Sequence, residues 1–256
     1  MARRPAVTAR RAVMAAAIAV PLLFSCSHAA DEAELFGRTK PEDYLTGRFN
    51  PVTHERFVCV NDAGVPTNEW RHYLRRETVT ALAKMYADFR KAHPKAPFWV
   101  QSSTRSFNDQ KAIWDGKWNG QRYAREKDPM HKALAILRYS SMPGTSRHHW
   151  GTDFDLNILT NEYYESGGGK VLYRWMTENA GRYGFCQPYT AGRKGGYNEE
   201  KWHWSYRPLA AALLGQWNNY FGRSVAAFSR TGLFSGSEIA GKLAPVFVNT
   251  ISESCR

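Results

Sequence analysis

The sequence predicts an α+β fold, with a small, mostly antiparallel sheet flanked by helices. Stretches in which apolar residues recur every three or four positions alternate with short runs rich in β-forming residues. This interleaving of helices with short strands disfavours a doubly wound parallel sheet. Hydrophobic residues make up 43% and aromatic residues 14% of the 256 residues, enough for a sizeable core. The sequence contains no internal repeat or low-complexity tract, so we expect one folded domain.

Residues 1–29 have the features of a signal peptide. Four arginines and no acidic residue lie in this segment, and residues 12–24 form an apolar run that is too short for a comfortable membrane span. Small residues at the positions that signal peptidase reads predict cleavage after Ala29. We therefore expect an exported protein of the periplasm or cell envelope.

Two features of the same segment leave its processing open. Leu23, Phe24, Ser25 and Cys26 resemble a lipoprotein box, so a lipid anchor at Cys26 is an alternative to simple cleavage. The paired arginines at residues 10–11 are also similar to those of a twin-arginine signal. The interpretation that we favour is an ordinary secretion signal, and export follows from either alternative.

After the signal peptide, the sequence predicts an arm and then a long helix. Residues 30–73 are expected to form an N-terminal arm, because prolines and glycines punctuate this stretch as they do loops. The arm would pack over a domain of residues 74–256. A helix is predicted over residues 75–92, where apolar residues recur at helical spacing.

The later elements alternate between strands and helices. Residues 98–102 predict a strand, and Ser106 with Asp109 three residues later predicts the cap of a helix that ends near Gly120. We further predict helices over residues 130–139, 170–183, 208–220 and 238–252, strands over 152–156 and 202–206, and a glycine-rich hairpin or loop over 161–169.

The net charge of +12 does not indicate a nucleic-acid partner. Four of the 35 basic residues lie in the predicted signal peptide, which leaves 31 basic and 23 acidic residues, a net charge of +8. Such a surface suits an anionic envelope polymer as well as a nucleic acid. The sequence has no long Lys/Arg run and no nucleic-acid motif, and export separates the protein from nucleic acids.

Three cysteines follow the signal peptide, at Cys59, Cys186 and Cys255. They form no C-x-x-C pair, which excludes a structural zinc knuckle. In an oxidising compartment two of them can form a disulfide and leave one thiol, and all three pairings stay open.

Residues 143–155 contain half of a predicted metal site. His148 offers an imidazole and Asp155 a carboxylate, and both ligand types suit zinc. Gly151 allows the chain to turn tightly between them. Because side chains alternate along a strand, Asp155 can point towards His148 while Phe154 faces the core.

The other half lies in residues 198–204, where Glu200 precedes His203 by three positions. A catalytic zinc needs three protein ligands, an open position for water, and a nearby carboxylate that is not a ligand. His148, Asp155 and His203 supply the ligands, and Glu200 supplies the base. Each residue alone is a weak signal, and the combination predicts a zinc site on the sheet.

These residues resemble a known family. Ser146, His148, Gly151 and Asp155 form S-x-H-x-x-G-x-x-x-D, and an E-x-W-H segment ending at His203 follows. The pair of motifs resembles the VanY-like D-alanyl-D-alanine carboxypeptidases, which belong to a wider superfamily of zinc peptidases. The segment around Arg105 and Gln110 is similar to the family's R-S-x-x-x-Q, so the resemblance spans roughly residues 74–206.

The resemblance implies a zinc-dependent D-alanyl-D-alanine carboxypeptidase that hydrolyses the terminal peptide bond of peptidoglycan stem peptides. Glu200 would activate water and later protonate the leaving amine. Arg105 would face the scissile carbonyl and stabilise an oxyanion or a substrate carboxylate. Ser146 and Gln110 would bind the substrate or support Arg105. The domain of residues 74–256 would thus be a zinc peptidase domain with C-terminal helices.

Three positions depart from the family pattern or invite comparison with it. Asp153 stands where the family often has alanine, and it would alter the pocket, pair with Arg147 or point away. We interpret His149 as a residue behind the ligands or on the surface. Lys201 stands where endopeptidase relatives have histidine, which favours a carboxypeptidase. The alternatives are an L,D-carboxypeptidase, an endopeptidase on peptidoglycan, and a non-catalytic zinc-containing module that binds the wall.

Overall fold

The computed structural model of the protein describes residues 32–256 and Met1. The predicted signal peptide, its cleavage site and the cysteine of the lipoprotein box lie outside the described residues. Within the described part of the chain, no helix has the length and apolarity needed to cross a bilayer.

A four-stranded antiparallel sheet lies at the centre of the fold. Its strands are β3 (Val100–Ser102), β4 (Asp153–Leu156), β5 (Phe185–Cys186) and β6 (His203–Tyr206), and their order is β3-β4-β6-β5. Each neighbouring pair is antiparallel. The prediction of an α+β fold with a small antiparallel sheet is therefore confirmed.

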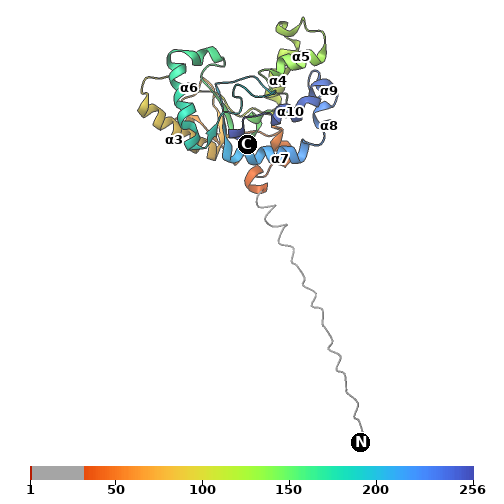
Figure 1. Ribbon diagram of the computed structural model, residues 1–256, viewed down its shortest axis with the longest axis horizontal. Coiled ribbons are helices and arrows are strands. Elements are labelled where there is room, and N and C mark those ends of the chain that lie inside the picture. The colour runs from red at the N-terminus through yellow and green to blue at the C-terminus, as the bar shows by residue number, and fades with distance from the viewer. Residues whose placement is uncertain (2–31) are drawn as a thin grey trace.

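Helices cover the sheet from two sides (Figure 1). On one side lie α3 (Arg76–Ala92) and α6 (Gly167–Asn179). On the other lie α4 (Phe107–Asn119), α5 (Pro129–Leu137) and α7 (Arg207–Phe221), with the C-terminal segments around them. These helices agree with the predicted ones to within a few residues at each end.

Two hydrophobic clusters fill the spaces between the sheet and its helices. One joins Phe154 and Leu156 of β4 to apolar residues of α3 and α6. The other cluster contains Trp114 of α4, Trp150 of the segment before β4, and Trp217 of α7. Because Phe154 points into the first cluster, its neighbours along the strand face the opposite side of the sheet, as the alternation of side chains requires.

Helix α4 begins at the predicted cap. Asp109 N donates to Ser106 Oγ at 3.2 Å, and Ser106 N donates to Asp109 Oδ2 at 2.9 Å. This reciprocal pair is a capping box, which satisfies two backbone donors at the helix start. The cap fixes where the chain leaves the loop after β3, and so it fixes the position of Arg105.

The N-terminal arm contains short elements where the sequence suggested only loop. These are α2 (Pro41–Leu45), β1 (Phe57–Cys59) and β2 (Tyr73–Arg75), and the two strands pair antiparallel. Elements of three to five residues are too short to show a periodic pattern. The arm contacts the segment before β4, since Tyr44 Oη donates to Trp150 O at 2.9 Å.

Short 3-10 segments connect the helices and strands. One of them shows that a loop prediction was wrong in part. Residues 161–169 are not a hairpin or loop throughout, because a 3-10 turn fills their first half and α6 begins at Gly167. The 3-10 segments are η1 (Asn61–Ala63), η2 (Gln121–Tyr123), η3 (Arg147–Trp150), η4 (Asn161–Glu165), η5 (Ala180–Tyr183), η6 (Gly241–Leu243) and η7 (Glu253–Cys255).

The single helix predicted over residues 238–252 is wrong. The chain instead forms α8 (Ala226–Ser229), α9 (Ser237–Ala240) and α10 (Ala244–Asn249), with a 3-10 turn between the last two. The break precedes Pro245 in the first turn of α10, whose missing N–H cannot bond to the carbonyl four residues earlier. Gly241 lies in this break and lets the backbone pass close to Phe228, because an added Cβ would lie 2.2 Å from the Phe228 carbonyl oxygen.

Position 151 requires glycine for two reasons, the backbone conformation there and the close approach of neighbouring atoms. Its φ is +75°, and an added Cβ would lie 2.4 Å from Phe57 Cε1. Gly64 has a similar φ of +73° but open space around it. We expect Gly151→Ala to lower the free energy of unfolding by about 1–3 kcal/mol more than Gly64→Ala, because only the former adds a steric clash to the backbone strain. Urea denaturation of both variants measures the difference, and equal losses would contradict this account of the turn.

The structure selects one of the three cysteine pairings. Cys186 of β5 is bonded to Cys255, with 5.5 Å between their Cα atoms. In the described part of the chain Cys59 is a free, buried thiol. The disulfide ties the C-terminal end to the strand that lies next to β6.

Loss of this disulfide is expected to destabilise the protein strongly. The two cysteines are 69 residues apart, and closure of a loop of that size stabilises a fold by about 4 kcal/mol. We expect the double variant Cys186→Ser/Cys255→Ser to lose stability of that order, measured by thermal or urea denaturation. Cys59→Ala is the matched control, and a loss as large as that of the double variant would argue against a special role for the bond.

Candidate metal centre and active site

The tight turn between η3 and β4 brings the two halves of the first motif together. His148 lies in η3, which begins at Ser146, whose Oγ accepts a hydrogen bond from His148 N at 3.3 Å. Gly151 then reverses the chain into β4, which carries Asp155. His203 is the first residue of β6 and lies opposite Asp155 in the strand register. The sheet therefore places the second motif beside the first.

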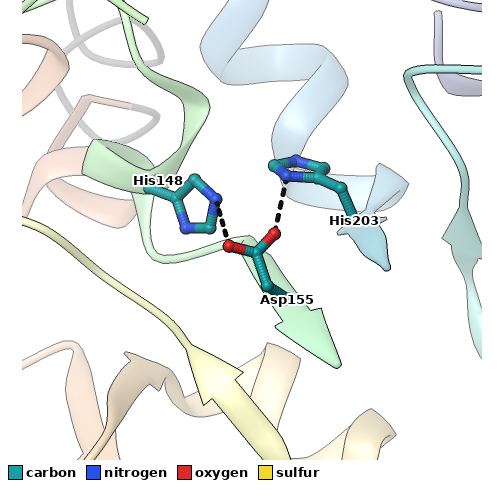
Figure 2. A group of neighbouring side chains, drawn as sticks. All are labelled: His148, Asp155 and His203. Atoms are coloured by element: carbon teal, nitrogen blue, oxygen red, sulfur yellow. Dashed lines mark ion pairs between the residues drawn. The ribbon is translucent and has the colours of Figure 1, made fainter. Parts of the chain in front are cut away.

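The three predicted ligands converge on one point (Figure 2). His148 Nε2 lies 3.4 Å from Asp155 Oδ2, and His203 Nδ1 lies 3.0 Å from Asp155 Oδ1. The ligand atoms of all three side chains lie within 4.8 Å of one another, and all three residues are buried.

Hydrogen bonds on the far side of each ring set which nitrogen faces this point. His148 Nδ1 lies 2.8 Å from the Ser103 carbonyl oxygen, which can only accept, so the lone pair of a neutral ring is on Nε2. His203 Nε2 lies 2.9 Å from Asp153 Oδ2, so its lone pair is on Nδ1. Both free nitrogens face Asp155. A metal-binding histidine typically has such an outer partner.

Asp155 is also arranged as a ligand. Its Oδ1 makes no hydrogen bond to any residue that the structure describes, although His203 Nδ1 is close. A cation bound between these two atoms would replace the ring proton that they otherwise share. Two nitrogens and one carboxylate form a donor set that suits zinc and leaves one coordination position open. The residues present therefore fit the metal that the motifs predict.

The charges around the site follow from burial and from these contacts. Burial, and then the Arg105 charge, lower the pKa of His148, which keeps its ring neutral. Burial also opposes the charged form of His203, but the carboxylates of Asp153 and Asp155 beside its two nitrogens outweigh it and raise the pKa of the metal-free ring to about 9, so a bound metal would displace the proton from Nδ1. Despite burial, His148 and His203 hold the pKa of Asp155 well below its usual range.

Glu200 lies beside the three predicted ligands. Its Oε2 is 3.7 Å from His203 Nδ1. The main chain fixes it, because Glu200 N donates to Tyr189 O at 2.9 Å and Gln187 Nε2 donates to Glu200 O at 3.1 Å. Burial raises the pKa of the Glu200 carboxyl to about 8. This is the non-ligand carboxylate that the second motif predicts.

The site opens into a cavity of about 520 Å³. The predicted ligands, Glu200, Arg105 and Gln110 all line it. No side chain in the described part of the chain forms a hydrogen bond with Arg105 Nε, which is buried. Arg105 thus presents an unpaired cationic group to the same space as the ligands.

The other two predicted substrate residues have different positions. Gln110 lines the cavity, and its Nε2 donates to Ser141 O at 2.7 Å instead of contacting Arg105. Ser146 is buried, and its hydroxyl accepts the backbone N–H of His148 at the start of η3. It does not appear among the residues of the cavity wall. Substrate binding by these two residues remains a prediction.

Sequence reasoning missed two basic residues of the cavity wall, Lys117 and Arg122. Lys117 lies on the face of α4 that also presents Gln110 and Ile113, at steps of three and four residues. Its amine contacts Ser140 Oγ. Helical spacing from Gln110 could have identified Lys117, because residues that are three or four positions apart share a helix face.

Asp153 and His149, the two unusual residues of the first motif, are both buried. Asp153 is fully buried and pairs with Arg147, with Oδ2 at 2.9 Å from Arg147 Nε. His149 is also fully buried and lies behind the ligands, so the alternative that it lies on the surface is wrong. Its Nδ1 lies 2.7 Å from Arg105 O, and burial lowers its pKa to about 3. His149 therefore holds the main chain at Arg105.

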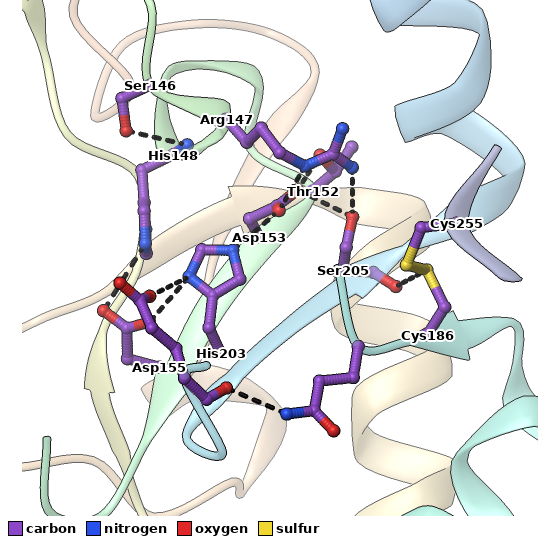
Figure 3. A network of polar contacts seen from close by, with 12 residues as sticks. Ser146, Arg147, His148, Thr152, Asp153, Asp155, Cys186, His203, Ser205 and Cys255 are labelled. Carbon is purple, nitrogen blue, oxygen red and sulfur yellow. Dashed lines mark hydrogen bonds and ion pairs between the residues drawn. A yellow bond between two sulfur atoms is a disulfide. The ribbon is translucent and has the colours of Figure 1, made fainter. Parts of the chain in front are cut away.

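The C-terminal end braces the segment that carries Glu200. Ser252 Oγ donates to Gln187 O at 2.8 Å, and Arg193 Nη1 donates to Thr250 O at 2.9 Å. The disulfide joins the same part of the chain to β5 (Figure 3). The C-terminal segment is thus connected both to β5 and to the loop between β5 and β6.

Comparisons with known proteins agree with this site. A family model described as VanY, D-alanyl-D-alanine carboxypeptidase, matches residues 71–209. Among curated proteins, the chain is similar to YodJ of Bacillus subtilis (strain 168), a presumed carboxypeptidase. The two are 30% identical over 155 residues, which are 58% of this chain and 52% of YodJ. It is also similar to a D-alanyl-D-alanine carboxypeptidase of Enterococcus faecalis (strain ATCC 700802 / V583), at 32% identity over 115 residues, 44% of this chain and 41% of that protein. The chain thus spans about half the length of these relatives or less.

Solved structures show more distant similarity. The LdcB LD-carboxypeptidase has 21% identity and a TM-score of 0.47, and the match covers 72% of this chain and 88% of that one. A vancomycin resistance D,D-pentapeptidase VanY, solved with Zn(II), has 24% identity and a TM-score of 0.45, with 58% and 82% covered. The family model, in contrast, matches more than half of the chain and includes both motifs. The chain belongs to the VanY family of D-alanyl-D-alanine carboxypeptidases.

Proposed function

We propose that the protein is a zinc-dependent D-alanyl-D-alanine carboxypeptidase that hydrolyses the terminal peptide bond of peptidoglycan stem peptides. The observation that carries this proposal is the convergence of His148, Asp155 and His203 on one point, with the Glu200 carboxyl beside it in an open cavity. The relatives' names support the reaction class, and the substrate is part of the proposal.

Glu200 is the general base and acid of the proposed reaction. When bound by the three ligands, zinc supplies a Lewis acid that polarises the scissile carbonyl and lowers the pKa of water. Glu200 accepts the proton of the attacking water and later delivers it to the leaving amine. Burial raises the pKa of Glu200 in the metal-free site, and a bound cation would lower it again, towards the range in which the carboxyl can take a proton from water and return it.

Arg105 stabilises the negative charge that develops on the scissile carbonyl oxygen. Its guanidinium group lines the cavity, and its charge acts on both Glu200 and His148. It is anchored through its main chain, because Arg105 N donates to His148 O at 3.2 Å and Arg105 O faces His149 Nδ1. A pre-oriented cation of this kind lowers the barrier without reorganisation during the reaction.

The cations of the cavity favour an exopeptidase over an endopeptidase. Among the residues that the structure describes, Lys117 and Arg122 have no carboxylate within ion-pair distance, although they line the same cavity as the ligands. The cavity wall also contains Asp155, Glu162 and Glu200, but none of these carboxylates is paired with Lys117 or Arg122, so both cations are available to an anionic group of the substrate. A carboxypeptidase substrate brings a free carboxylate at its C-terminal end, and an internal crosslink lacks one at the scissile residue. We assign this carboxylate to Lys117.

Lys117→Gln is expected to weaken binding of the free-acid peptide specifically. We expect its Kd to rise about tenfold or more, the size of a hydrogen bond to a charged group, while the Kd of the C-terminal amide stays unchanged. Calorimetry on proteins that also carry Glu200→Gln measures binding without turnover. Lys127→Gln, which changes an exposed lysine outside the cavity wall, is the control. Equal effects on acid and amide would remove Lys117 from carboxylate recognition.

Digestion of purified muropeptides tests the function and its alternatives. Release of D-alanine from pentapeptides, abolished by a chelator and restored by zinc, is the expected result. Release from tetrapeptides instead would make the protein an L,D-carboxypeptidase, and cleavage of crosslinked dimers would make it an endopeptidase. Retention on sacculi without any product would favour the non-catalytic binding module. Each outcome is identified by the mass of the products.

We also propose that the protein acts in the periplasm or cell envelope. The proposal rests on the features of residues 1–29, and the Cys186–Cys255 disulfide supports it because such bonds persist in oxidising compartments. Fractionation of cells that produce the full chain, with and without residues 1–29, tests export. Metabolic labelling with a palmitate analogue in wild type and Cys26→Ser tests the lipid anchor.

A further inference from the structure

Asp153 is a buried carboxylate that contacts one of the proposed metal ligands from behind (Figure 3). It lies two residues before Asp155 on the same face of β4, so the two carboxylates meet opposite edges of the His203 ring. Asp155 Oδ1 is 3.0 Å from His203 Nδ1, and Asp153 Oδ2 is 2.9 Å from His203 Nε2. The imidazole is thus held between them.

Three more side chains fix Asp153 itself. Arg147 Nε donates to Asp153 Oδ2 at 2.9 Å. Ser205 Oγ and Thr152 Oγ1 donate to Oδ1 at 2.8 Å and 2.6 Å. Arg147 Nη2 also donates to Ser205 Oγ at 2.7 Å, which closes the network. Its members come from η3, β4 and β6 and from the residue before β4, so the carboxylate is fully bonded and its orientation is set by several parts of the fold.

Stability alone does not explain this network. A buried ion pair loses the hydration of both charges, and its replacement by apolar residues is often neutral or even stabilising. The location of the pair next to His203 suggests another role. A carboxylate behind a metal-binding histidine fixes the ring orientation, keeps the proton on the outer nitrogen and makes the inner nitrogen a stronger donor.

We propose that Asp153, oriented by Arg147, is a positioning residue that holds His203 in the tautomer and orientation needed to bind the metal. The proposal rests on the metal site of the proposed function. A small apolar residue at this position would leave His203 Nε2 without its acceptor, which explains why a carboxylate stands there. Asp153 contacts neither the cavity nor the open coordination position, so it acts only through His203.

The test separates metal binding from folding. The double variant Arg147→Met/Asp153→Ala removes both buried charges, so we expect stability close to that of the wild type and zinc affinity lower by about ten- to a hundredfold. Asp153→Asn keeps the shape of the side chain and is the second test variant. If the double variant fails to fold, zinc affinity is measured on Asp153→Asn instead. Zinc affinity is measured by competition with a chromophoric chelator, and stability by urea denaturation of the metal-free proteins.

A second readout follows His203 directly. In ¹⁵N-labelled metal-free protein, the double variant should change the chemical shifts of the His203 ring nitrogens, whereas those of His148 should be preserved. The control pair Arg71→Met/Asp62→Ala removes an exposed ion pair of the N-terminal arm and should leave zinc affinity unchanged. Wild-type zinc affinity in a folded Asp153 variant would overturn the proposal. Failure of the wild type to bind zinc would instead overturn the metal site on which the proposed function rests.

Discussion

Replacing Glu200 with glutamine is expected to lower kcat on a stem pentapeptide by about a hundred- to ten-thousandfold, the usual contribution of a general base and acid. Glutamine has the same shape but cannot accept the proton of water. The fold should be retained, because burial opposes a charge at this position and the neutral glutamine fills the same space. Zinc content should also be retained, since Glu200 is not one of the three converging ligands.

The adjacent carboxylate supplies the matched control. Glu199 does not line the cavity, and its carbonyl oxygen accepts a hydrogen bond from Asn161 Nδ2 at the start of η4. We expect Glu199→Gln to have nearly wild-type kcat. Substantial turnover by Glu200→Gln, or a larger loss in Glu199→Gln, would show that the base has been assigned to the wrong residue.

Replacing His203 with alanine is expected to abolish zinc retention and, with it, hydrolysis. The change removes one of only three protein ligands, so zinc affinity should fall by more than the roughly ten- to a hundredfold that follows loss of an outer hydrogen-bond partner. Atomic absorption after gel filtration should then show a zinc content close to zero, against one ion per chain in the wild type.

His131→Ala controls for the loss of a histidine as such. His131 is exposed on α5 and lies outside the cavity, so its replacement should change neither zinc content nor activity. Wild-type zinc content in His203→Ala would mean that the metal is held elsewhere. Circular dichroism of both variants shows whether loss of zinc reflects loss of the ligand or loss of the fold.

Several parts of the fold were predictable because they depend on local sequence. Ser106 and Asp109 form a capping box within four consecutive residues, so the start of α4 is visible in the sequence. The alternation of Phe154 and Asp155 is equally local, because successive strand residues face opposite sides. The prediction of one C-terminal helix failed although its signal was also local, because Pro245 within the predicted range lacks the N–H that a continuous helix needs.

The ligand residues and the base were identifiable from their types and spacing alone. Imidazole, carboxylate and a second imidazole, with a free carboxylate three positions before the last, form a set with few other uses. The sequence also established the α+β class, since the order of helical and strand patterns is written along the chain.

Tertiary structure alone decided which distant groups meet. The pairing of Cys186 with Cys255 and the contact between Asp153 and His203 each join segments that no local pattern connects. Side chains alternate in a strand whatever lies opposite, but the register of β4 against β6 determines which residues become neighbours. That register places His203 between two carboxylates, and the sequence of either strand by itself contains no information about it.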